Sequence, residues 1–171
     1  MDAIVITGPT ASGKSELSFK LAELINGEII SADSAQVYRG LDIGTAKPEK
    51  FVQDKLKHHL LDIRDPSEIY TVANFRNDAS RTVEEIKGRG KVPIISGGTM
   101  LYLKALREGL ADLPAADPSV RESIEVEASR YGWEKIHKDL EVFDPVAAAR
   151  IKANDSQRLQ RAVEVYQLTG I

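Results

Sequence analysis

The sequence contains no cysteine and no long apolar segment, and each absence excludes a class of protein. Without cysteine there are neither disulfides nor thiolate metal sites. No stretch approaches the ~18–20 consecutive apolar residues that span a bilayer, and the first residues lack the basic start and apolar core of a signal peptide. These absences predict a soluble, cytoplasmic protein that does not bind membranes, and a monomer is the default expectation.

Charge and size set two further bounds. Because the formal net charge is −3, bulk charge does not make the chain a polyanion binder. RNA binding would require basic residues gathered on one face. The 171 residues, 42% of them apolar, suffice for a sizeable buried core.

Apolar residues follow two alternating patterns in the first 113 residues, one typical of strands and one typical of helices. Short apolar runs typical of buried strands occupy residues 3–7, 28–31 and 92–96, with a weaker candidate at 60–63. Apolar residues recur at helical spacing after Lys14, over residues 72–86 and again from near Thr99. This rhythm predicts an α/β fold in which helices cover a parallel sheet.

The pattern changes near residues 113–118, and no strand pattern follows. Helical stripes occupy 120–131 and 133–143, Asp144–Pro145 resembles a cap with proline in the first turn, and Asn154 or Asp155 would cap a last helix. We therefore predict a core at residues 1–113 and an all-helical insertion subdomain at 114–171. Four strands make a small sheet for this architecture. The last residues, 169–171, have the pattern of a helix end followed by the start of another element. We expect a chain that is incomplete at its C-terminus.

A phosphate-binding motif, Gly-x-x-x-x-Gly-Lys-Ser, lies between the first strand and the first helix. Its residues are Gly8, Pro9, Thr10, Ala11, Ser12, Gly13, Lys14 and Ser15. The glycines let backbone N–H groups turn toward an anion, Lys14 reaches terminal phosphate oxygens, and the Ser15 hydroxyl suits a bound Mg²⁺. Both flanks fit a P-loop rather than an accidental glycine-rich turn. Kinases, ATPases and diphosphate-handling transferases all remain open.

Two further candidates follow strands of the same sheet. Asp33 comes directly after the second strand and is a general base, a magnesium partner or a turn cap. Thr99, after Gly97–Gly98, is a helix cap or a substrate contact, and its spacing favours capping alone. The strand at 92–96 does not end in an acidic residue, which disfavours a plain ATPase.

Most basic residues, Lys47 among them, are expected to be ordinary solvated surface. Gln157, Arg158 and Arg161 lie away from the apolar stripe of the last helix and are better candidates for a binding role. His58 and His59 are adjacent and His137 is isolated, so the spacing of the histidines disfavours a metal site.

Several blocks of sequence together resemble the tRNA dimethylallyltransferase (isopentenyltransferase) family. They are residues 8–15, Asp33–Tyr38, Asp42–Pro48, His59–Ile63, Gly97–Tyr102, Asp144–Pro145 and Asn154–Ala162. The blocks occur in the family's order and cover nearly the whole chain. The sequences of this family continue well past the position of residue 171.

The resemblance implies a P-loop NTPase-like core that transfers a dimethylallyl group from dimethylallyl diphosphate to N6 of the adenosine beside the tRNA anticodon. The P-loop would hold the donor's diphosphate rather than split ATP, with Mg²⁺ assisting, and Asp33, Thr99 and Lys14 would be catalytic. The positions that match tRNA contacts in the anticodon stem-loop are Asp33, Ser34, Ala35, Gln36, Thr99, Arg121, Gln157, Arg158, Leu159, Gln160 and Arg161.

The residues suit this chemistry, and two other functions remain alternatives. A carboxylate activates the weakly nucleophilic adenine amine, and the P-loop stabilises the leaving diphosphate. A small-molecule or nucleotide kinase shares the P-loop, the carboxylate and a helical lid, but it would consume ATP. A non-catalytic nucleotide- or RNA-binding fragment would bind without turnover.

Overall fold

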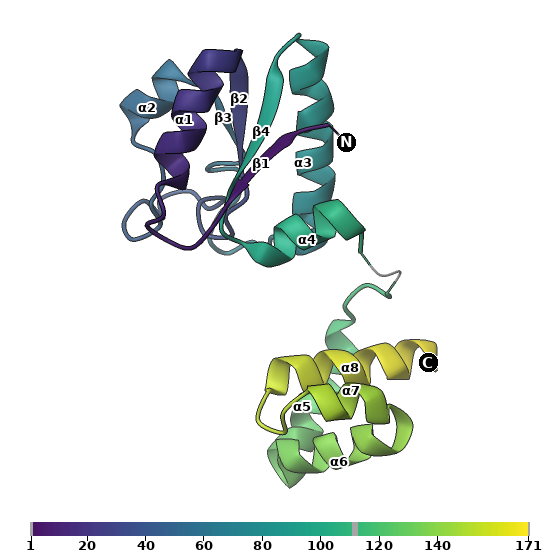
Figure 1. Cartoon of the computed structure of the whole chain (residues 1–171). Helices are drawn as coiled ribbons and strands as arrows, with labels where there is room; N and C mark the ends of the chain where they lie inside the picture. The colour runs from purple at the N-terminus through teal and green to yellow at the C-terminus, as the bar shows by residue number, and fades with distance from the viewer. Residues whose placement is uncertain (1, 111–112, 171) are drawn as a thin grey trace. The chain divides into compact units, whose positions relative to one another are not determined.

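The computed structural model describes residues 2–110 and 113–170. The chain folds as two compact units, residues 1–110 and 111–171, which are described separately (Figure 1). The division falls close to the boundary that the sequence indicates after residue 113.

A four-stranded parallel sheet forms the centre of the first unit, which confirms the predicted fold class. The strands are β1 (Ile4–Thr7), β2 (Gly27–Ser31), β3 (His58–His59) and β4 (Val92–Gly97). Their order in the sheet is β1-β4-β2-β3, and all pairs are parallel. Every residue of β2 is buried, as expected for a strand covered on both faces.

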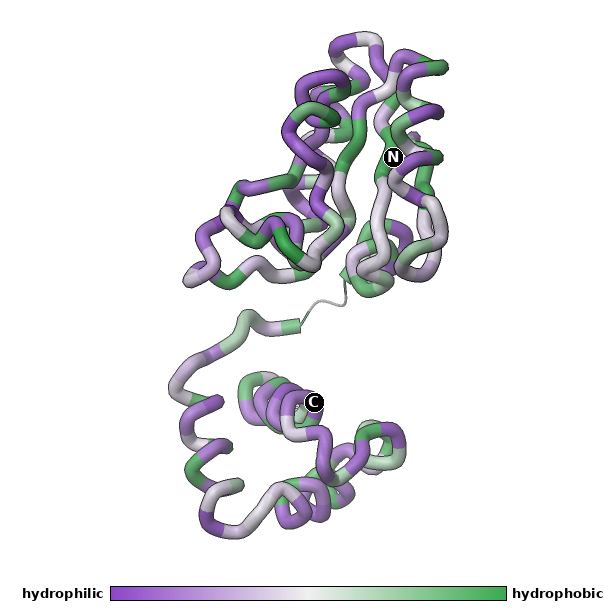
Figure 2. The backbone as a smooth tube through the Cα atoms, turned by 90° about the vertical axis from the view of Figure 1, so that its left-hand side faces the viewer, coloured by the Kyte–Doolittle hydropathy of each residue, from purple (hydrophilic) through white to green (hydrophobic). Residues whose placement is uncertain are grey.

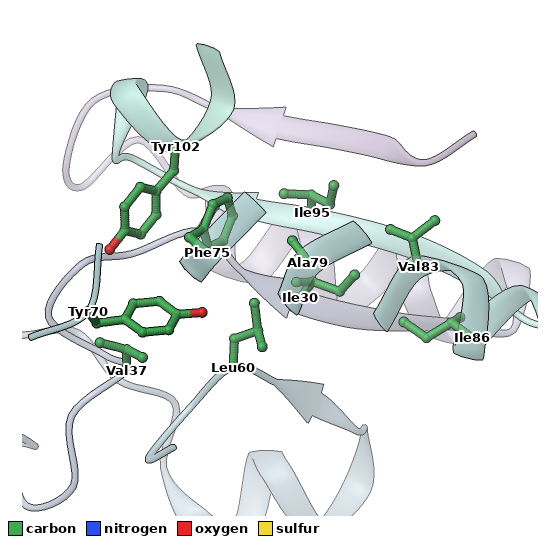
Figure 3. Packing of buried hydrophobic residues seen from close by; sticks show 11 residues of the cluster. Ile30, Val37, Leu60, Tyr70, Phe75, Ala79, Val83, Ile86, Ile95 and Tyr102 are labelled. Atoms are coloured by element: carbon green, nitrogen blue, oxygen red, sulfur yellow. The ribbon is translucent and has the colours of Figure 1, made fainter. Parts of the chain in front are cut away.

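Helices cover both faces of this sheet. They are α1 (Lys14–Ile25), α2 (Lys50–Lys55), α3 (Val72–Gly88) and α4 (Met100–Glu108). Side chains alternate between the two faces of a strand, so neighbouring isoleucines belong to different cores. Ile29 and Ile94 pack with Ala22 of α1. Ile30 and Ile95 pack on the other face, against α3 and α4 (Figure 3).

The larger core is built around stacked aromatic rings. Phe75 of α3 and Tyr102 of α4 stack with ring centroids 4.1 Å apart, and Tyr70 meets Tyr102 edge-on at 6.5 Å (Figure 3). Both tyrosines are buried. The rings therefore pack α4 against the first turn of α3 and against the loop that precedes α3.

Two sequence predictions for this unit are wrong in detail. Residues 60–63 do not form a strand, because Leu60 and Asp62 adopt left-handed φ angles of 61° and 54° that break the extended backbone. The strand here is β3, two residues earlier. Helix α2 lies where no helix was predicted, and its six residues contribute no buried side chain, so it carries no clear apolar stripe.

The second unit contains helices and no strand in its described part, residues 113–170. The helices are α5 (Pro118–Tyr131), α6 (Trp133–Phe143), α7 (Pro145–Arg150) and α8 (Ser156–Thr169). Asp144 caps α7 ahead of Pro145, as predicted, and Asp155 rather than Asn154 caps α8. Ile124, Leu140 and Leu159 lie in its core. Hydrophobic and hydrophilic residues alternate along its helices (Figure 2).

Among the described residues of both units, no helix is long and apolar enough to span a membrane.

A buried carboxylate ties the strands together at the end of the sheet where β2 and β4 begin. Glu28 of β2 lies 2.6 Å from His59 Nε2, 2.7 Å from an Arg89 Nη atom and 3.0 Å from Lys91 Nζ. Burial acts to raise the pKa of Glu28, but hydrogen bonds from His59, Arg89 and Lys91 outweigh it and lower the pKa to about 2. The charged form of Glu28 is therefore the one that stabilises the fold.

We expect acid to destabilise the first unit through Glu28. A folded-state pKa of about 2, against 4.5 for an ordinary glutamate, corresponds to on the order of 3 kcal/mol of stability. This contribution is fully present above pH 4.5 and is lost as the pH falls toward 2. Chemical denaturation at a series of pH values measures it. In Glu28→Gln the free energy of unfolding should be lower at pH 7 and depend less on pH below 4.5; an unchanged acid dependence would contradict this role.

Candidate active site

The carboxyl ends of three neighbouring strands bring the predicted site residues to one edge of the sheet. The parallel register pairs Thr7 of β1 with Gly97 of β4, and Ser31 of β2 with Ser96 of β4. Three segments therefore begin at the same edge of the sheet: the P-loop, residues 33–36 and Gly98–Thr99. This edge is where parallel α/β sheets bind ligands.

Glycines allow the three loops to touch. A Cβ atom on Gly97 would lie 2.8 Å from Ala32 Cα, and closer still to the Ala32 carbonyl. This close approach supports hydrogen bonds from Ala32 N to Ser96 O, at 2.8 Å, and from Thr99 N to Ala32 O, at 3.2 Å. On the other side, a Cβ on Gly98 would lie 3.7 Å from Gly8 O. Gly97 and Gly98 thus connect the P-loop to the segment that carries Asp33.

The P-loop follows β1 and begins α1, as the sequence predicts. Ala11 and Gly13 adopt left-handed φ angles of 63° and 80°, which curl the backbone around the start of the helix. No side chain caps α1, so the N–H groups of its first turn face the loop. Lys14 Nζ donates to Pro9 O at 2.5 Å and lies 3.5 Å from Ser12 Oγ, which places the ammonium over the loop, where an anion would meet it.

Two serines missed by sequence reasoning join the start of α1 to the end of β4. Ser18 Oγ donates to Lys14 O at 2.7 Å and lies 2.7 Å from Ser96 Oγ. Since Ser18 has one hydroxyl proton, Ser96 donates the second bond. Ser18 is buried, and this contact holds Lys14 in register with the strand that leads to Thr99.

Ser15, the predicted metal ligand, is exposed in the first turn of α1. Mg²⁺ commonly uses one or two protein ligands and takes the rest from phosphates and water, so a single hydroxyl beside a phosphate loop fits that ion. Within residues 2–110 and 113–170, no group of three or more histidine, aspartate and glutamate side chains forms a metal cluster.

Asp33 uses one carboxylate oxygen to cap a turn. Oδ1 accepts from Ala35 N at 2.8 Å and from Gln36 N at 3.3 Å, while no group in the described part of the chain donates to Oδ2. The turn-cap interpretation is therefore correct for one oxygen, and the other remains available to a substrate. Burial raises the pKa of Tyr102, and the nearby Tyr38 and the charge of Asp33 raise it further.

Thr99 is the first residue before α4, but its hydroxyl does not cap the helix. Instead Oγ1 accepts from Ser34 N at 3.0 Å and lies 3.5 Å from Ser34 Oγ. The prediction that Thr99 acts as a cap alone is wrong, because a neighbouring loop takes the hydroxyl. Hydrogen bonds to the side chains of Thr99 and Asp33 thereby fix the backbone of residues 34–36.

Gln36 braces a loop rather than pointing outward. Its Oε1 accepts from Ser31 Oγ at 2.8 Å, and its Nε2 donates to Thr45 O and Ala46 O at 3.0 and 3.1 Å. These bonds use the amide within the protein. Within the protein, the Gln36 side chain therefore supports the loop at residues 42–47.

Lys47 is the clearest error among the basic residues. Its side chain is only 4% exposed and ion-pairs with Asp42 at 2.7 Å and Asp62 at 2.6 Å. The Tyr38 carbonyl accepts the third proton, at 2.9 Å. Burial acts to lower the pKa of Lys47, but the hydrogen bonds that its ammonium donates to the two carboxylates raise it overall. Lys47 is thus a structural ammonium that joins the loop at 42–47 to the turn at 60–62.

The remaining predicted tRNA contacts belong to the helical unit. Gln157 and Arg158 are exposed at the start of α8. The side chain of Leu159 is fully buried in the core, on the apolar stripe of α8. Gln160 Nε2 donates to Glu125 Oε1 at 2.9 Å. Arg121 and Arg161 both bind Glu164.

Comparison with known proteins agrees with this geometry. A family model described as IPP transferase matches residues 36–171. The chain is 53% identical over 167 residues to a tRNA dimethylallyltransferase of Methylococcus capsulatus and 56% identical over 168 residues to one of Ralstonia pickettii. Each alignment covers 98% of this chain, against 54% and 52% of the relatives.

Solved structures show the same likeness. A crystal structure of a eukaryotic dimethylallyltransferase acting on tRNA aligns with a TM-score of 0.82 and 35% identity, covering 99% of this chain and 42% of its own. The tRNA isopentenylpyrophosphate transferase of Bacillus halodurans aligns with a TM-score of 0.63 and 45% identity, over 99% of this chain and 56% of its own. The chain spans about half the length of the curated relatives it matches. The chain belongs to the IPP transferase family.

Proposed function

We propose that this chain carries the site that transfers a dimethylallyl group from dimethylallyl diphosphate to N6 of the adenosine beside the tRNA anticodon. The observation that supports this most directly is that a P-loop meets Asp33 at one edge of the sheet, where one Asp33 oxygen accepts no hydrogen bond from the described residues. The name of the relatives, tRNA dimethylallyltransferase, supports the part of this proposal that concerns transfer of a dimethylallyl group to tRNA.

Asp33 acts as the general base. The adenine amine is a weak nucleophile because its lone pair is delocalised into the ring, so removal of its proton speeds attack. A bond forms between N6 and the first carbon of the allyl group while the bond from that carbon to the diphosphate oxygen breaks. The N6 proton passes to Asp33 Oδ2. Asp33 Oδ1 keeps its turn contacts with Ala35 N and Gln36 N during this transfer.

The P-loop stabilises the leaving diphosphate as its charge develops. The N–H groups of the first turn of α1 and the Lys14 ammonium meet the phosphate oxygens. Lys14 exchanges the Pro9 carbonyl for the ligand. The Ser15 hydroxyl would hold a Mg²⁺ ion, which would supply further positive charge to the leaving diphosphate.

The tRNA presents its adenosine from a single-stranded loop. A stacked base cannot reach Asp33, so it flips out at a cost of about a few kcal/mol. Arg158 and Gln157, exposed on α8, contact the anticodon stem-loop. Because the substrate is a tRNA, we propose that the protein acts in the cytoplasm. Because one chain supplies all these residues, we propose that it acts as a monomer.

The ATPase alternative lacks a feature that it needs. Strand β4 ends at Ser96–Gly97, and the Ser96 hydroxyl bonds Ser18, so the position typical of a magnesium-binding aspartate in an NTPase holds a structural serine. The site is thereby better suited to a diphosphate leaving group than to ATP hydrolysis.

The function is tested by single-turnover incubation of the chain with radiolabelled dimethylallyl diphosphate, Mg²⁺ and unmodified tRNA. Labelled ATP serves as the parallel control. We expect label on an adenosine of the anticodon loop and none from ATP. Phosphate transfer from ATP would make the chain a kinase. Binding of the donor and of tRNA without transfer would make it a binding fragment.

Arg158→Ala should weaken tRNA binding and flatten its salt dependence. Arg158 has a 75% exposed side chain, and loss of one phosphate contact lowers the slope of log K against log[salt] by about 0.7 to 0.9. Arg130→Ala makes the same charge change at an exposed position of α5 and should keep the slope. Equal slopes for the two variants would remove Arg158 from the RNA interface. The measurement is a fluorescence titration of a labelled anticodon stem-loop at several salt concentrations.

A further inference from the structure

The helical unit contains one fully buried carboxylate, Glu164, among the residues that the structure describes there. It lies on α8, three residues after Arg161. Its two oxygens accept four hydrogen bonds, which is the full capacity of a carboxylate. Oε1 accepts from Asp117 N at 2.8 Å and Arg121 Nε at 2.9 Å. Oε2 accepts from Arg121 Nη2 at 3.0 Å and Arg161 Nη1 at 2.7 Å.

Both arginines are held in a fixed orientation by these bonds. Arg121 meets Glu164 as a two-pronged fork, the geometry that fixes a guanidinium most strongly. Arg161 is held at two points, because its Nη2 also donates to Pro114 O at 2.7 Å. Their side chains remain 40% and 34% exposed. Within the described chain, two of the five N–H groups of each guanidinium are used, so three on each remain for an outside acceptor.

Glu164 also ties these arginines to the segment that enters the helical unit. Asp117 caps α5 through its side chain, while its backbone N–H binds Glu164. Pro114 binds Arg161. Two stretches that are far apart in the sequence, residues 114–121 and the middle of α8, thus converge at one carboxylate.

We infer that Glu164 is a positioning residue for RNA: it aims Arg121 and Arg161 together at adjacent phosphates of the bound stem-loop. This inference rests on the proposed function, because the phosphates are those of the tRNA. A guanidinium loses most of its side-chain freedom when a phosphate binds it, and an arginine that is already fixed loses less. Burial acts to raise the pKa of Glu164, but Arg121, Arg161 and the Asp117 N–H lower it to about 2, so the carboxylate stays charged at every physiological pH.

The inference and bulk electrostatics make opposite predictions for Glu164→Gln. The change removes one negative charge beside the RNA-binding face, so charge alone predicts tighter binding. The glutamine amide, however, places an N–H₂ group against arginine donors and releases at least one guanidinium. We expect roughly tenfold weaker binding of the anticodon stem-loop, with a salt slope smaller by about 1.

Glu122→Gln is the matched control, since Glu122 is exposed on the same helix as Arg121. It makes the same charge change and should bind the stem-loop at least as tightly as the unsubstituted chain, with the same slope. Glu164→Gln in an Arg121→Ala, Arg161→Ala background should have no further effect, because Glu164 acts through these two arginines. A full additional loss there would overturn the inference.

The outcomes separate the inference from the function on which it rests. If the unsubstituted chain shows no salt-dependent binding of the stem-loop, both fail. If it binds and Glu164→Gln binds equally well or more tightly, the inference alone fails and Glu164 is a structural ion-pair partner. Circular dichroism checks that each variant is folded.

A measurement on the unsubstituted chain decides the matter should Glu164→Gln fail to fold. The Nε–H of Arg121 is bonded to Glu164 and gives a protected side-chain signal in ¹H–¹⁵N spectra. On addition of the stem-loop, this signal should shift and stay protected if Glu164 holds the arginine in the complex. Loss of protection to the level of the exposed Arg130 would show that RNA pulls Arg121 away, which would overturn the inference.

Discussion

Asp33→Asn should lower the single-turnover rate of prenyl transfer by a factor of about 10² to 10⁴, the usual contribution of a general base. The structure makes asparagine the informative replacement. Its side-chain oxygen can accept from Ala35 N and Gln36 N, as Asp33 Oδ1 does at 2.8 and 3.3 Å, so the turn is kept. The amide nitrogen replaces Oδ2 and accepts no proton. Rapid quenching of reactions with labelled donor measures the rate, and calorimetry measures donor binding.

Asp65→Asn is the matched control for this prediction. Asp65 also caps a turn, through a bond from Ser67 N at 3.0 Å, and loses the same charge in the same unit. It should leave the transfer rate unchanged. Transfer by Asp33→Asn at the unsubstituted rate would contradict the assignment of Asp33 as the base. Loss of donor binding in Asp33→Asn would instead give Asp33 a role in holding the diphosphate or its metal ion.

The fold and the location of the site could be predicted from the sequence because their signals are local. Buried strands in a parallel sheet read as apolar runs, and a P-loop has fixed spacing between its glycines and Lys14. Asp33 and Thr99 follow strands of the same sheet, so the parallel topology alone places them at one edge. These inferences required no knowledge of a distant contact.

What the sequence did not show depends on partners far apart along the chain. Lys47 looks like any surface lysine until Asp62 is folded against it. Glu164 looks like half of a helical pair with Arg161, yet its second partner, Arg121, lies 43 residues away. The predicted strand at residues 60–63 differs from β3 for another reason. A left-handed φ angle is uncommon for a leucine such as Leu60, although an aspartate such as Asp62 adopts it more readily, so the apolar run gives no sign that the extended backbone stops at residue 60.

Gly97→Ala should have the largest effect on stability of any single methyl addition considered for the first unit. The new Cβ would lie 2.8 Å from Ala32 Cα and closer to the Ala32 carbonyl, and backbone atoms cannot rotate away as the end of a side chain can. Strands β2 and β4 would separate at their carboxyl ends. The bonds from Ala32 N to Ser96 O and from Thr99 N to Ala32 O would then lengthen. We expect a loss of about 3 kcal/mol, at the upper end for overpacking.

Gly88→Ala provides the contrast, because Gly88 lies at the end of α3 with nothing within 4 Å of an added Cβ. Alanine has the higher helix propensity, so this variant should be as stable as the unsubstituted chain or up to about 1 kcal/mol more stable. Hydrogen exchange at the amides of Ala32 and Thr99 measures the separation of β2 and β4 directly. Trp133, the single tryptophan, reports on the helical unit through its fluorescence. In Gly97→Ala we expect faster exchange at both amides with an unchanged Trp133 signal in native buffer.

The same contact holds Asp33 near the P-loop. Donor binding at Lys14 and the transfer rate should therefore fall together in Gly97→Ala and not in Gly88→Ala. Normal protection of Ala32 in Gly97→Ala would show that the sheet edge can adapt to the methyl group, and that the glycine is not what joins the two halves of the site.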